Sequence, residues 1–447
     1  MMKSTLICLA WLLLITGAIS AEIETQSYDL TLADCLAQTF RNNPDIQTLR
    51  ADVERAAGDK LVYSSRLLPQ LATQVQAGQE YGSLYPQNGM FSTLTAQLSQ
   101  PLIDVGIPPA LRRGRLEVAL AGQTFYRETT DRLNKARNTF VHALYIRDLL
   151  ALSNEIMQHL QANVTSAQQR LDAGLGTRVA VAQAQVQALN LARDLASLSN
   201  EYFSTTTQLA ELTGNNFNVP TNHVILPRPV GTLVYRPITI DLPAETAYAL
   251  AHRADIGFLR TLVASAIADE QIVTADFFPR LTLEADLLFI PNSVLLTKQT
   301  QLVAGQSMLA TEERAGVGLT WRVIDNGQVI GARRRLDAIR QEYILTLHKL
   351  EEAVPRELAE IAGALQTAVA QHDAFVKSVA AAAENLKLIE ARLALGQATQ
   401  LDFLNAQSDL LGVSAGLINA VATHEVARND FDHATGRYLE FYISAQR

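Results

Sequence analysis

RLDAGLGTRVAVAQAQ (residues 170–185) and RLALGQATQLDFLNAQ (residues 392–407) are two versions of one sequence pattern. Each begins with Arg-Leu, has a glycine four residues later and a threonine three residues after that glycine, and ends in Ala-Gln. The two copies lie 222 residues apart, about half of the 447-residue chain. Glycine permits the left-handed turn that ends a helix, and threonine is a good N-cap for the next helix. Each stretch therefore predicts an elbow between two helices.

The elbows are the last part of a longer internal repeat. Three further pairs of segments match between the two halves of the chain: residues 32–50 with 242–260, 67–75 with 277–285, and 98–106 with 319–327. The third pair includes PLIDVG and RVIDNG, which predict similar turns. Each half therefore has the same order: helix, alternating segment, loop, second alternating segment, long helix, elbow and helix.

The predicted helices are unusually long. No proline occurs between Pro109 and Pro220, and apolar residues recur at helical spacing from Arg112 to Asp172. Those 61 residues would span roughly 90 Å as a helix, which favours coiled-coil packing over a globular domain. The second half repeats this pattern from about residue 331 to 395, with Pro355 as a predicted kink or junction.

The alternating segments have a period of two residues. In PRLTLEADLLFI the apolar side chains of Leu281, Leu283, Ala285, Leu287 and Phe289 share one face, and polar residues occupy the other. This alternation over about ten residues is typical of a transmembrane β-strand. A soluble sheet packed on the helices is the alternative. Aromatic residues near the strand ends would form an interfacial girdle: Tyr81, Tyr85, Phe91, Phe289 and Trp321.

The number of strands predicts an assembly. Four strands cannot close a barrel, and an open sheet edge is not tolerated in lipid. A dimer would have eight strands and a filled interior, whereas a trimer would have twelve strands and a lumen. The polar face, which would point inward, favours the trimer because its lumen would hold water.

The chain divides into four parts. Residues 1–20 have the layout of a secretory signal peptide, and residues 21–213 form the first repeat, with strands at about 68–81 and 92–104. Residues 214–243 are a proline-rich connector, with short strands expected around Thr232–Tyr235 and Thr239–Asp241. Residues 244–447 form the second repeat, with strands at about 279–290 and 313–325.

Composition excludes several classes of function. The net charge of −8 gives a nucleic-acid partner no electrostatic support. Apart from the signal peptide, no run approaches the ~20 apolar residues that a transmembrane helix needs. Neither a nucleophile elbow nor a nucleotide-binding fingerprint occurs, and the eight histidines are scattered as lone helix-surface residues without metal-ligand spacing. We expect no enzymatic activity, no cofactor and no bound metal.

The order and duplication of these features resemble the TolC-type outer membrane efflux protein family across essentially the whole mature chain. The resemblance implies a mainly α-helical protein with a transmembrane β-barrel: a trimeric 12-stranded barrel in the outer membrane of a Gram-negative-type cell, continued by a long α-helical barrel in the periplasm. It further implies an exit duct for small molecules or proteins, in multidrug efflux or type I secretion. The implied partners are a homotrimer, a periplasmic adaptor protein, an inner-membrane transporter and outer-membrane lipid.

The resemblance also implies roles for the elbows. The family's adaptor-docking tips correspond to Gly174, Leu175, Gly176, Thr177, Gly396, Gln397, Ala398 and Thr399. Its periplasmic constriction corresponds to Asp402, with Asn405 on the same helix face and Arg178 as a further candidate. Two simpler interpretations remain open: the elbows are ordinary hairpin turns, and Asp402 only stabilises a helix N-terminus. The alternative function is a structural or adhesive trimeric coiled coil of the cell envelope that does not transport.

Overall fold

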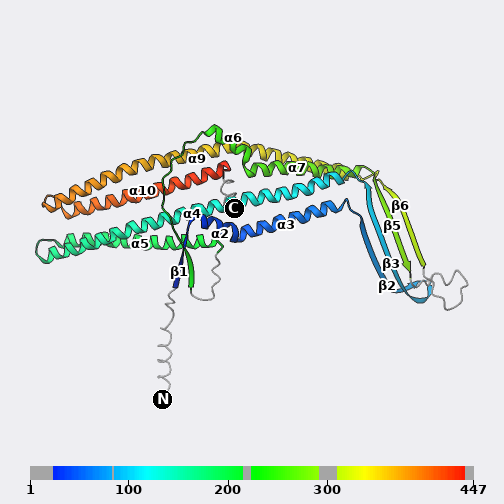
Figure 1. Ribbon diagram of the computed structural model, residues 1–447, viewed down its shortest axis with the longest axis horizontal. Coiled ribbons are helices and arrows are strands. Elements are labelled where there is room, and N and C mark those ends of the chain that lie inside the picture. Colours follow the sequence, from blue (N-terminus) through cyan, green and yellow to red (C-terminus); the bar gives the residue numbers. More distant parts are fainter. Residues whose placement is uncertain (1–23, 83–84, 215–222, 291–309, 438–447) are drawn as a thin grey trace, which may run out of the picture. The chain divides into compact units, whose positions relative to one another are not determined.

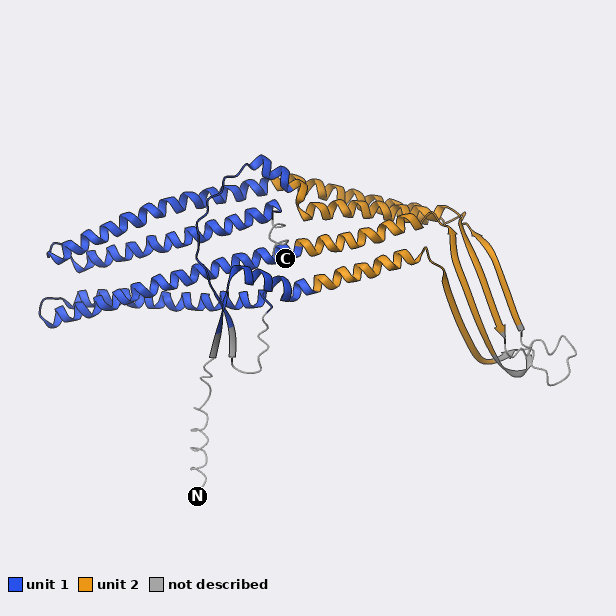
Figure 2. Cartoon of the chain, viewed as in Figure 1, with its two compact units in different colours: residues 1–47, 128–249, 356–447 blue, residues 48–127, 250–355 orange. Residues whose placement is uncertain are grey.

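The computed structural model describes residues 24–82, 85–214, 223–290 and 310–437 (Figure 1). The predicted signal peptide therefore lies outside the described residues. The chain forms two compact units, shown in different colours in Figure 2. Unit 1 contains residues 1–47, 128–249 and 356–447, and unit 2 contains residues 48–127 and 250–355. Each unit draws on both sequence repeats.

Unit 2 contains a four-stranded antiparallel sheet in the order β2-β3-β5-β6. Its strands are β2 (Gln70–Gly82), β3 (Tyr85–Ile103), β5 (Arg280–Ile290) and β6 (Ala310–Thr320). Strands β2 and β6 are the two edges. The repeated segments thus meet at the centre of the sheet, where β3 of the first repeat pairs with β5 of the second.

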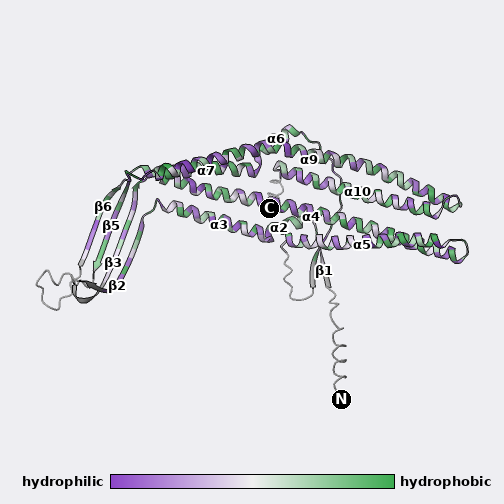
Figure 3. Cartoon of the chain, turned by 180° about the vertical axis from the view of Figure 1, so that it is seen from behind, coloured by the Kyte–Doolittle hydropathy of each residue, from purple (hydrophilic) through white to green (hydrophobic). Residues whose placement is uncertain are grey.

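The register gives the sheet one apolar and one polar face. Leu71, Leu98, Ala285 and Ala315 lie opposite one another across the four strands, and side chains that face each other across a sheet share one face. One residue further along, Gln97, Asp286 and Arg314 form a row on the other face. Figure 3 shows hydrophobic and hydrophilic residues along each strand. Apolar side chains are exposed on the first face: Leu71, Val75, Leu94, Leu283, Val317 and Leu319.

Strand β6 ends earlier than the alternation predicted. The expected strand ran to residue 325, but β6 stops at Thr320, so Trp321 and Val323 lie beyond its end. The strand ends there because Thr320 pairs with Arg280, the first residue of β5, so β5 offers no partner for Trp321. Further along the chain, the side chain of Asp325 accepts the backbone N–H groups of Gly327 and Val329, at 3.0 and 2.8 Å, at the start of the next helix. Asp104 makes the corresponding bond to Gly106 after β3, at 2.7 Å. The repeated Asp-x-Gly sequence is therefore a strand-to-helix turn in both halves.

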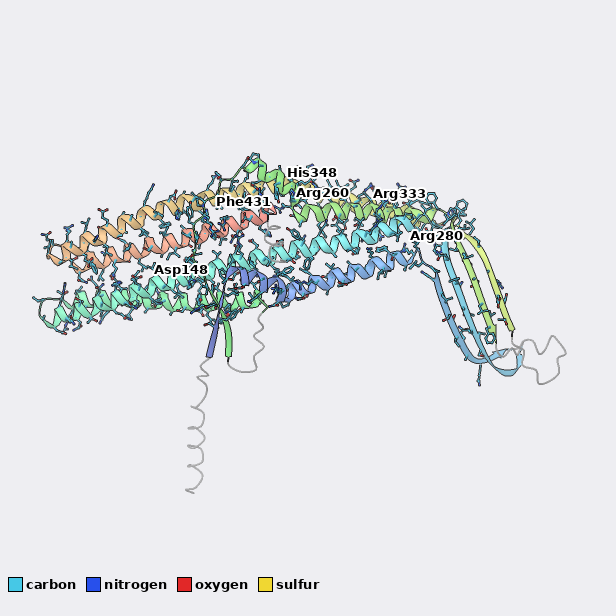
Figure 4. The ribbon with its side chains drawn as sticks, viewed as in Figure 1. Asp148, Arg260, Arg280, Arg333, His348 and Phe431 are labelled. Carbon is cyan, nitrogen blue, oxygen red and sulfur yellow. The ribbon has the colours of Figure 1, made fainter. Side chains whose placement is uncertain are left out.

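Four helices complete unit 2: α3 (Pro44–Ser65), α7 (Ala254–Thr274), and the initial parts of α4 (Ile107–Asp172) and α9 (Gln328–Ala394). A short 3₁₀ helix, η1 (Ala275–Phe277), leads into β5. Charged residues of helix α7 form ion pairs with α9, and two of the arginines involved, Arg260 and Arg333, are labelled in Figure 4. Glu270 pairs with Arg333 at 3.2 Å, and Arg260 pairs with Glu351 at 2.9 Å. These pairs join α7 to α9 on the outside of the helices.

Unit 1 is built from two helical hairpins. The first joins the end of α4 to α5 (Arg178–Leu212), and the second joins the end of α9 to α10 (Gln400–Thr435). Helix α9 continues through Pro355, and the boundary between the two units falls directly after that residue. Helix α6 (Leu242–His252) precedes the second repeat's segment of unit 2.

A hydrophobic core joins α2 (Leu32–Asn42) to α4 and α5. It is formed by Leu30, Cys35, Leu36, Leu133, Ala136, Phe140, Leu144, Leu209 and Leu212. Burial raises the pKa of the Cys35 thiol to about 12, so this cysteine is an inert apolar core residue.

The connector differs from its prediction. Residues 230–241, which include the two expected short strands, have no helix or strand. Instead β4 (His223–Pro229) pairs in parallel with β1 (Glu24–Leu30), the first element of the described residues. The prediction was wrong because alternation over three or four residues is too short to identify a strand. The partner of β4 lies about 200 residues away in the sequence.

Helix α10 differs from the prediction that no segment apart from the signal peptide approaches the apolar length of a transmembrane helix. Among the described helices it alone has the length and apolar composition of a membrane span, and 17% of the matching window is buried. Few of its residues are charged, but polar side chains attach it to α4. Asn134 and Asn138 both donate to Asp430, at 3.0 and 2.8 Å, and Arg137 pairs with Asp432 at 3.6 Å. These contacts assign α10 to the helical bundle.

Candidate functional site at the two helical elbows

The first elbow ends α4 with a hydrogen-bonded glycine turn. The backbone N–H of Gly174 donates to the carbonyl of Leu171 at 2.9 Å, and that of Leu175 donates to Arg170 at 2.8 Å. Gly174 has a φ of +74°, the left-handed conformation that favours glycine. Thr177 then caps α5, because its hydroxyl accepts the N–H of Ala180 at 3.2 Å.

The second elbow repeats this geometry at the same offset of 222 residues. Gly396 donates to Leu393 at 3.0 Å and has a φ of +70°, and Gln397 donates to Arg392 at 2.8 Å. Thr399 caps α10, and its hydroxyl accepts the N–H of Asp402 at 3.2 Å. The sequence repeat is therefore also a repeat of backbone conformation and hydrogen bonding.

The two elbows differ at the third residue of the returning helix. This residue is Ala180 in the first elbow and Asp402 in the second. The carboxylate of Asp402 accepts both the hydroxyl of Thr399, at 2.7 Å, and its backbone N–H, at 2.8 Å, which completes a capping box. These hydrogen bonds from Thr399 hold the pKa of Asp402 below its ordinary value. Asp402 thus stabilises the helix N-terminus, and it is also an exposed negative charge at the tip.

The other predicted tip residues form an exposed end. The side chain of Leu175 is 84% exposed, and Leu395 beside Gly396 is 72% exposed. Gly174, Thr177, Gly396, Gln397 and Thr399 are exposed, whereas Gly176 and Ala398 are half-buried. Each elbow therefore presents one exposed leucine beside its glycine turn.

The predicted constriction residues are not linked to one another within the protomer. Asp402, Asn405 and Arg178 are all exposed. Asn405 lies on α10, one turn after Asp402, whereas Arg178 starts α5. In the described part of the chain no hydrogen bond or ion pair joins Arg178 to Asp402. A ring of these residues around a common axis remains a prediction for the assembled protein.

A cavity that the sequence did not predict lies between the two hairpins. It has a volume of about 190 Å³ and is lined by the apolar residues Leu160, Leu191 and Leu404 and by polar residues that include Gln187 and Gln407. The amide of Asn163 donates to Gln407 at 3.0 Å, which links α4 to α10. The sequence feature that marks this cavity is the final Ala-Gln of the repeat. Ala184 and Ala406 are both buried against the partner helices. Of the two glutamines, Gln407 is buried, whereas Gln185 is exposed.

The predicted interfacial aromatics lie at both ends of the sheet. Trp321 follows β6 at the end next to the helices, and its indole N–H donates to the carbonyl of Phe277 at 3.0 Å. Phe289 lies near the other end, opposite Leu94 and Thr311. Tyr81 belongs to β2, and Tyr85 and Phe91 belong to β3.

The capping box predicts a response to acid. The folded-state pKa of Asp402 is lowered, so its contribution to stability is present above the unfolded value of about 4 and is lost as the pH falls through the lower folded value. We expect Asp402→Ala to speed hydrogen exchange at the start of α10 at pH 7. We expect wild type to show the same acceleration, relative to unfolded peptide, only below pH ~4. The start of α5, where Ala180 takes the place of Asp402, is the internal control. Equal responses at both helix starts would contradict the assignment.

An amphipathic sheet and two long helical hairpins are the elements that define the fold of outer-membrane channels that extend into the periplasm. The sequence profile described as "Outer membrane efflux protein" matches residues 36–215 and 247–437, one match for each repeat. The chain therefore belongs to the outer membrane efflux protein family. It is a protein of the outer membrane and extends into the periplasm.

Relatives of this chain include two proteins that match almost its full length. The outer membrane efflux protein BepC of Brucella suis is 25% identical over 432 residues, which cover 93% of this chain and 87% of BepC. The outer membrane protein TolC of Escherichia coli is 21% identical and covers 92% of this chain and 84% of TolC. Among solved structures, the Campylobacter jejuni CmeC outer membrane channel has a TM-score of 0.76 at 16% identity, covering 91% of this chain and 85% of CmeC. The Vibrio cholerae outer membrane protein VceC has a TM-score of 0.73 at 18% identity, covering 91% and 96%.

Proposed function

We propose that this protein is a homotrimeric exit duct of the outer membrane, supplied by an inner-membrane pump through a periplasmic adaptor protein. The observation that carries the proposal is the four-stranded sheet with one exposed apolar face, one polar face and two unpaired edges. In lipid, each edge must find a partner strand. Pairing β6 of one copy with β2 of the next would close three sheets into a 12-stranded barrel, with the apolar face outward and the polar face around a lumen.

The elbows are the proposed adaptor-docking site. The two elbows share one backbone geometry, and each presents an exposed leucine beside its turn. A trimer would bring six such turns to one end of the duct. This repeated set of similar surfaces fits a partner that binds several times around the opening.

We propose small molecules as the cargo. The descriptions of two relatives support this choice: BepC is an efflux protein, and OpmQ of Pseudomonas aeruginosa, 23% identical over 331 residues, is a pyoverdine export protein. Export of whole proteins is the alternative.

Conductance separates a duct from an envelope stalk. We expect the purified protein to carry an ion current across a planar lipid bilayer. We expect Asp402→Ala to weaken its preference for cations, because three carboxylates near the axis would attract them. If neither wild type nor Asp402→Ala conducts, the duct proposal fails and the non-transporting coiled coil is favoured.

Cross-linking in cells tests the docking site. Single cysteines at Thr177 and at Thr399 are expected to trap one periplasmic protein, because both residues are exposed at the elbows. A cysteine at Leu345, exposed on α9 in unit 2, is the matched control and should trap none of that protein. Equal capture at all three positions, or no capture at the elbows, would contradict adaptor docking there.

A further inference from the structure

The connector forms a strap in unit 1 that touches both hairpins. We use the name strap for residues 230–241, which run between β4 and α6 (Figure 1). Arg147 of α4 holds its beginning: the guanidinium donates to the carbonyl of Pro229 at 3.0 Å and to that of Gly231 at 2.8 Å. Asp148, labelled in Figure 4, pairs with the same guanidinium at 2.6 Å. Leu233 then packs against the core of the first hairpin.

Two residues later the strap reaches the second hairpin. The ring of Tyr235 stacks on His372 of α9, with ring centroids 3.6 Å apart and planes inclined by 7°. The same ring packs against His424 of α10, with centroids 4.6 Å apart and an interplanar angle of 54°. Tyr235 therefore joins both helices of the second hairpin to a segment that Arg147 attaches to the first.

His424 is fully buried, which contradicts the prediction that the histidines are helix-surface residues. Neither ring nitrogen has a hydrogen-bond partner among the residues that the structure describes. A single sequence does not reveal this burial, because α10 has mostly apolar residues on all sides of this position. A neutral imidazole can be accommodated in such a site at moderate cost, whereas an imidazolium without a partner is strongly disfavoured.

The charged groups around the stacked rings of Tyr235, His372 and His424 further favour the neutral form of His424. On α10, Arg428 lies near His424 and pairs with Glu425 at 2.5 Å. On α9, His372 pairs with Asp373 at 3.2 Å. On the strap, Arg236 is the charged residue next to Tyr235, and on α4 Arg147 and Asp148 lie at the beginning of the strap. Burial lowers the pKa of His424, and the positive charges of Arg428 and His372 lower it further.

We propose that the strap is a pH-sensitive latch between the two hairpins, closed while His424 is neutral and released when His424 takes up a proton. The latch does not depend on the proposed transport function, because it concerns contacts within one protomer.

The burial of His424 decides how the stability of the latch depends on pH. The latched state binds the proton of His424 less readily than the released state, in which the imidazole reaches water and has a pKa near 6.5. Latch stability is therefore complete above that value and is lost as the pH falls below it. Folding changes the pKa of buried carboxylates elsewhere in the chain in both directions: that of Asp432 is raised and that of Asp255 is lowered. The pH dependence of overall stability therefore does not isolate the latch, and the strap itself has to be measured.

Hydrogen exchange of the strap measures the latch directly. The full-length protein in detergent is exchanged at pH 7.5 and pH 5.5, and the rates of the peptide covering residues 230–241 are divided by those of the same peptide unfolded. We expect exchange to become on the order of tenfold faster at pH 5.5, the factor that corresponds to ~1.4 kcal/mol. No change of this ratio in wild type would overturn the proposal.

Three variants assign the response to the stack. His424→Phe keeps an aromatic ring but cannot be protonated, so its strap should remain protected at both pH values. Tyr235→Ala removes the contact from the strap side, where the risk of misfolding is small, and should exchange rapidly at both values. His348→Phe is the matched control, because His348 is 70% exposed on α9 in unit 2, and it should respond as wild type does (Figure 4). A pH response that persists in Tyr235→Ala would show that another group is responsible.

Discussion

Replacing Leu98 by arginine is expected to lower the free energy of unfolding by about 2–4 kcal/mol, because it places a charge on the apolar face of the sheet, which faces lipid in the proposed barrel. Leu98 lies on a central strand, opposite Leu71 of β2 and Ala285 of β5. Ala285 is the middle residue of β5 and Ala315 is the middle residue of β6, so this row crosses the middle of both strands of the second repeat. The measurement is urea-induced unfolding of the protein in lipid vesicles, with the yield of assembled protein as a second readout.

Gln97→Arg is the matched control for Leu98→Arg. The two residues are neighbours on β3 and differ only in the face they occupy. Gln97 lies opposite Ala72 and Asp286, so an arginine there meets a carboxylate on the polar face. We expect its effect to remain within about 0.5 kcal/mol. Similar losses in both variants would show that the apolar face does not contact lipid, and the barrel proposal would fail.

Gly214→Ala is expected to destabilise the protein by about 2–5 kcal/mol, the sum of left-handed strain and overpacking. Gly214 follows the C-terminus of α5 with a φ of +75°, and a Cβ atom there would lie 2.6 Å from the backbone carbonyl carbon of Asn42. This corner cannot easily move, because the amide of the buried Asn43 donates to the carbonyl of Leu212 at 2.9 Å. Asn43 also accepts the N–H of Asp45 at 3.0 Å and so caps the first turn of α3.

Gly363→Ala is the control for this prediction. Gly363 lies inside α9, and no heavy atom lies within 4 Å of the position that its Cβ would take, its own helix backbone left aside. Alanine is favoured over glycine in a helix by ~1 kcal/mol, so this variant should be as stable as wild type or more stable. Thermal unfolding of both variants in the same detergent distinguishes them. A mild Gly214→Ala variant would indicate that the corner between α2 and α5 opens readily.

The elbows and the sheet were largely predictable from the sequence. A left-handed glycine followed three residues later by a capping threonine is a local pattern, and both copies have the same hydrogen bonds. The strand alternation is also local, so it predicted that Leu281 and Thr282 lie on different faces before any pairing was known. The exact end of β6 was missed, because it depends on where the partner strand β5 begins, at Arg280, rather than on hydropathy.

Other features depended on residues that are distant in the sequence. The pairing of β1 with β4 joins segments about 200 residues apart, and neither segment alternates long enough to identify itself. The double role of Asp402 required its distances to Thr399, since an acidic residue near a helix start has the same appearance in the sequence with or without a capping box.

The sequence by itself determined the duplicated order of elements, the two elbows, and the apolar and polar faces of the strands. These properties arise from backbone conformations and from spacings of two to four residues, which neighbouring residues control. Only the tertiary structure decided which glutamine of the repeat is buried, where the connector runs, and that His424 lies beneath Tyr235. Burial of a single side chain is the result of all the segments that pack around it, and in this protein α9, α10 and the strap come from separate parts of the chain.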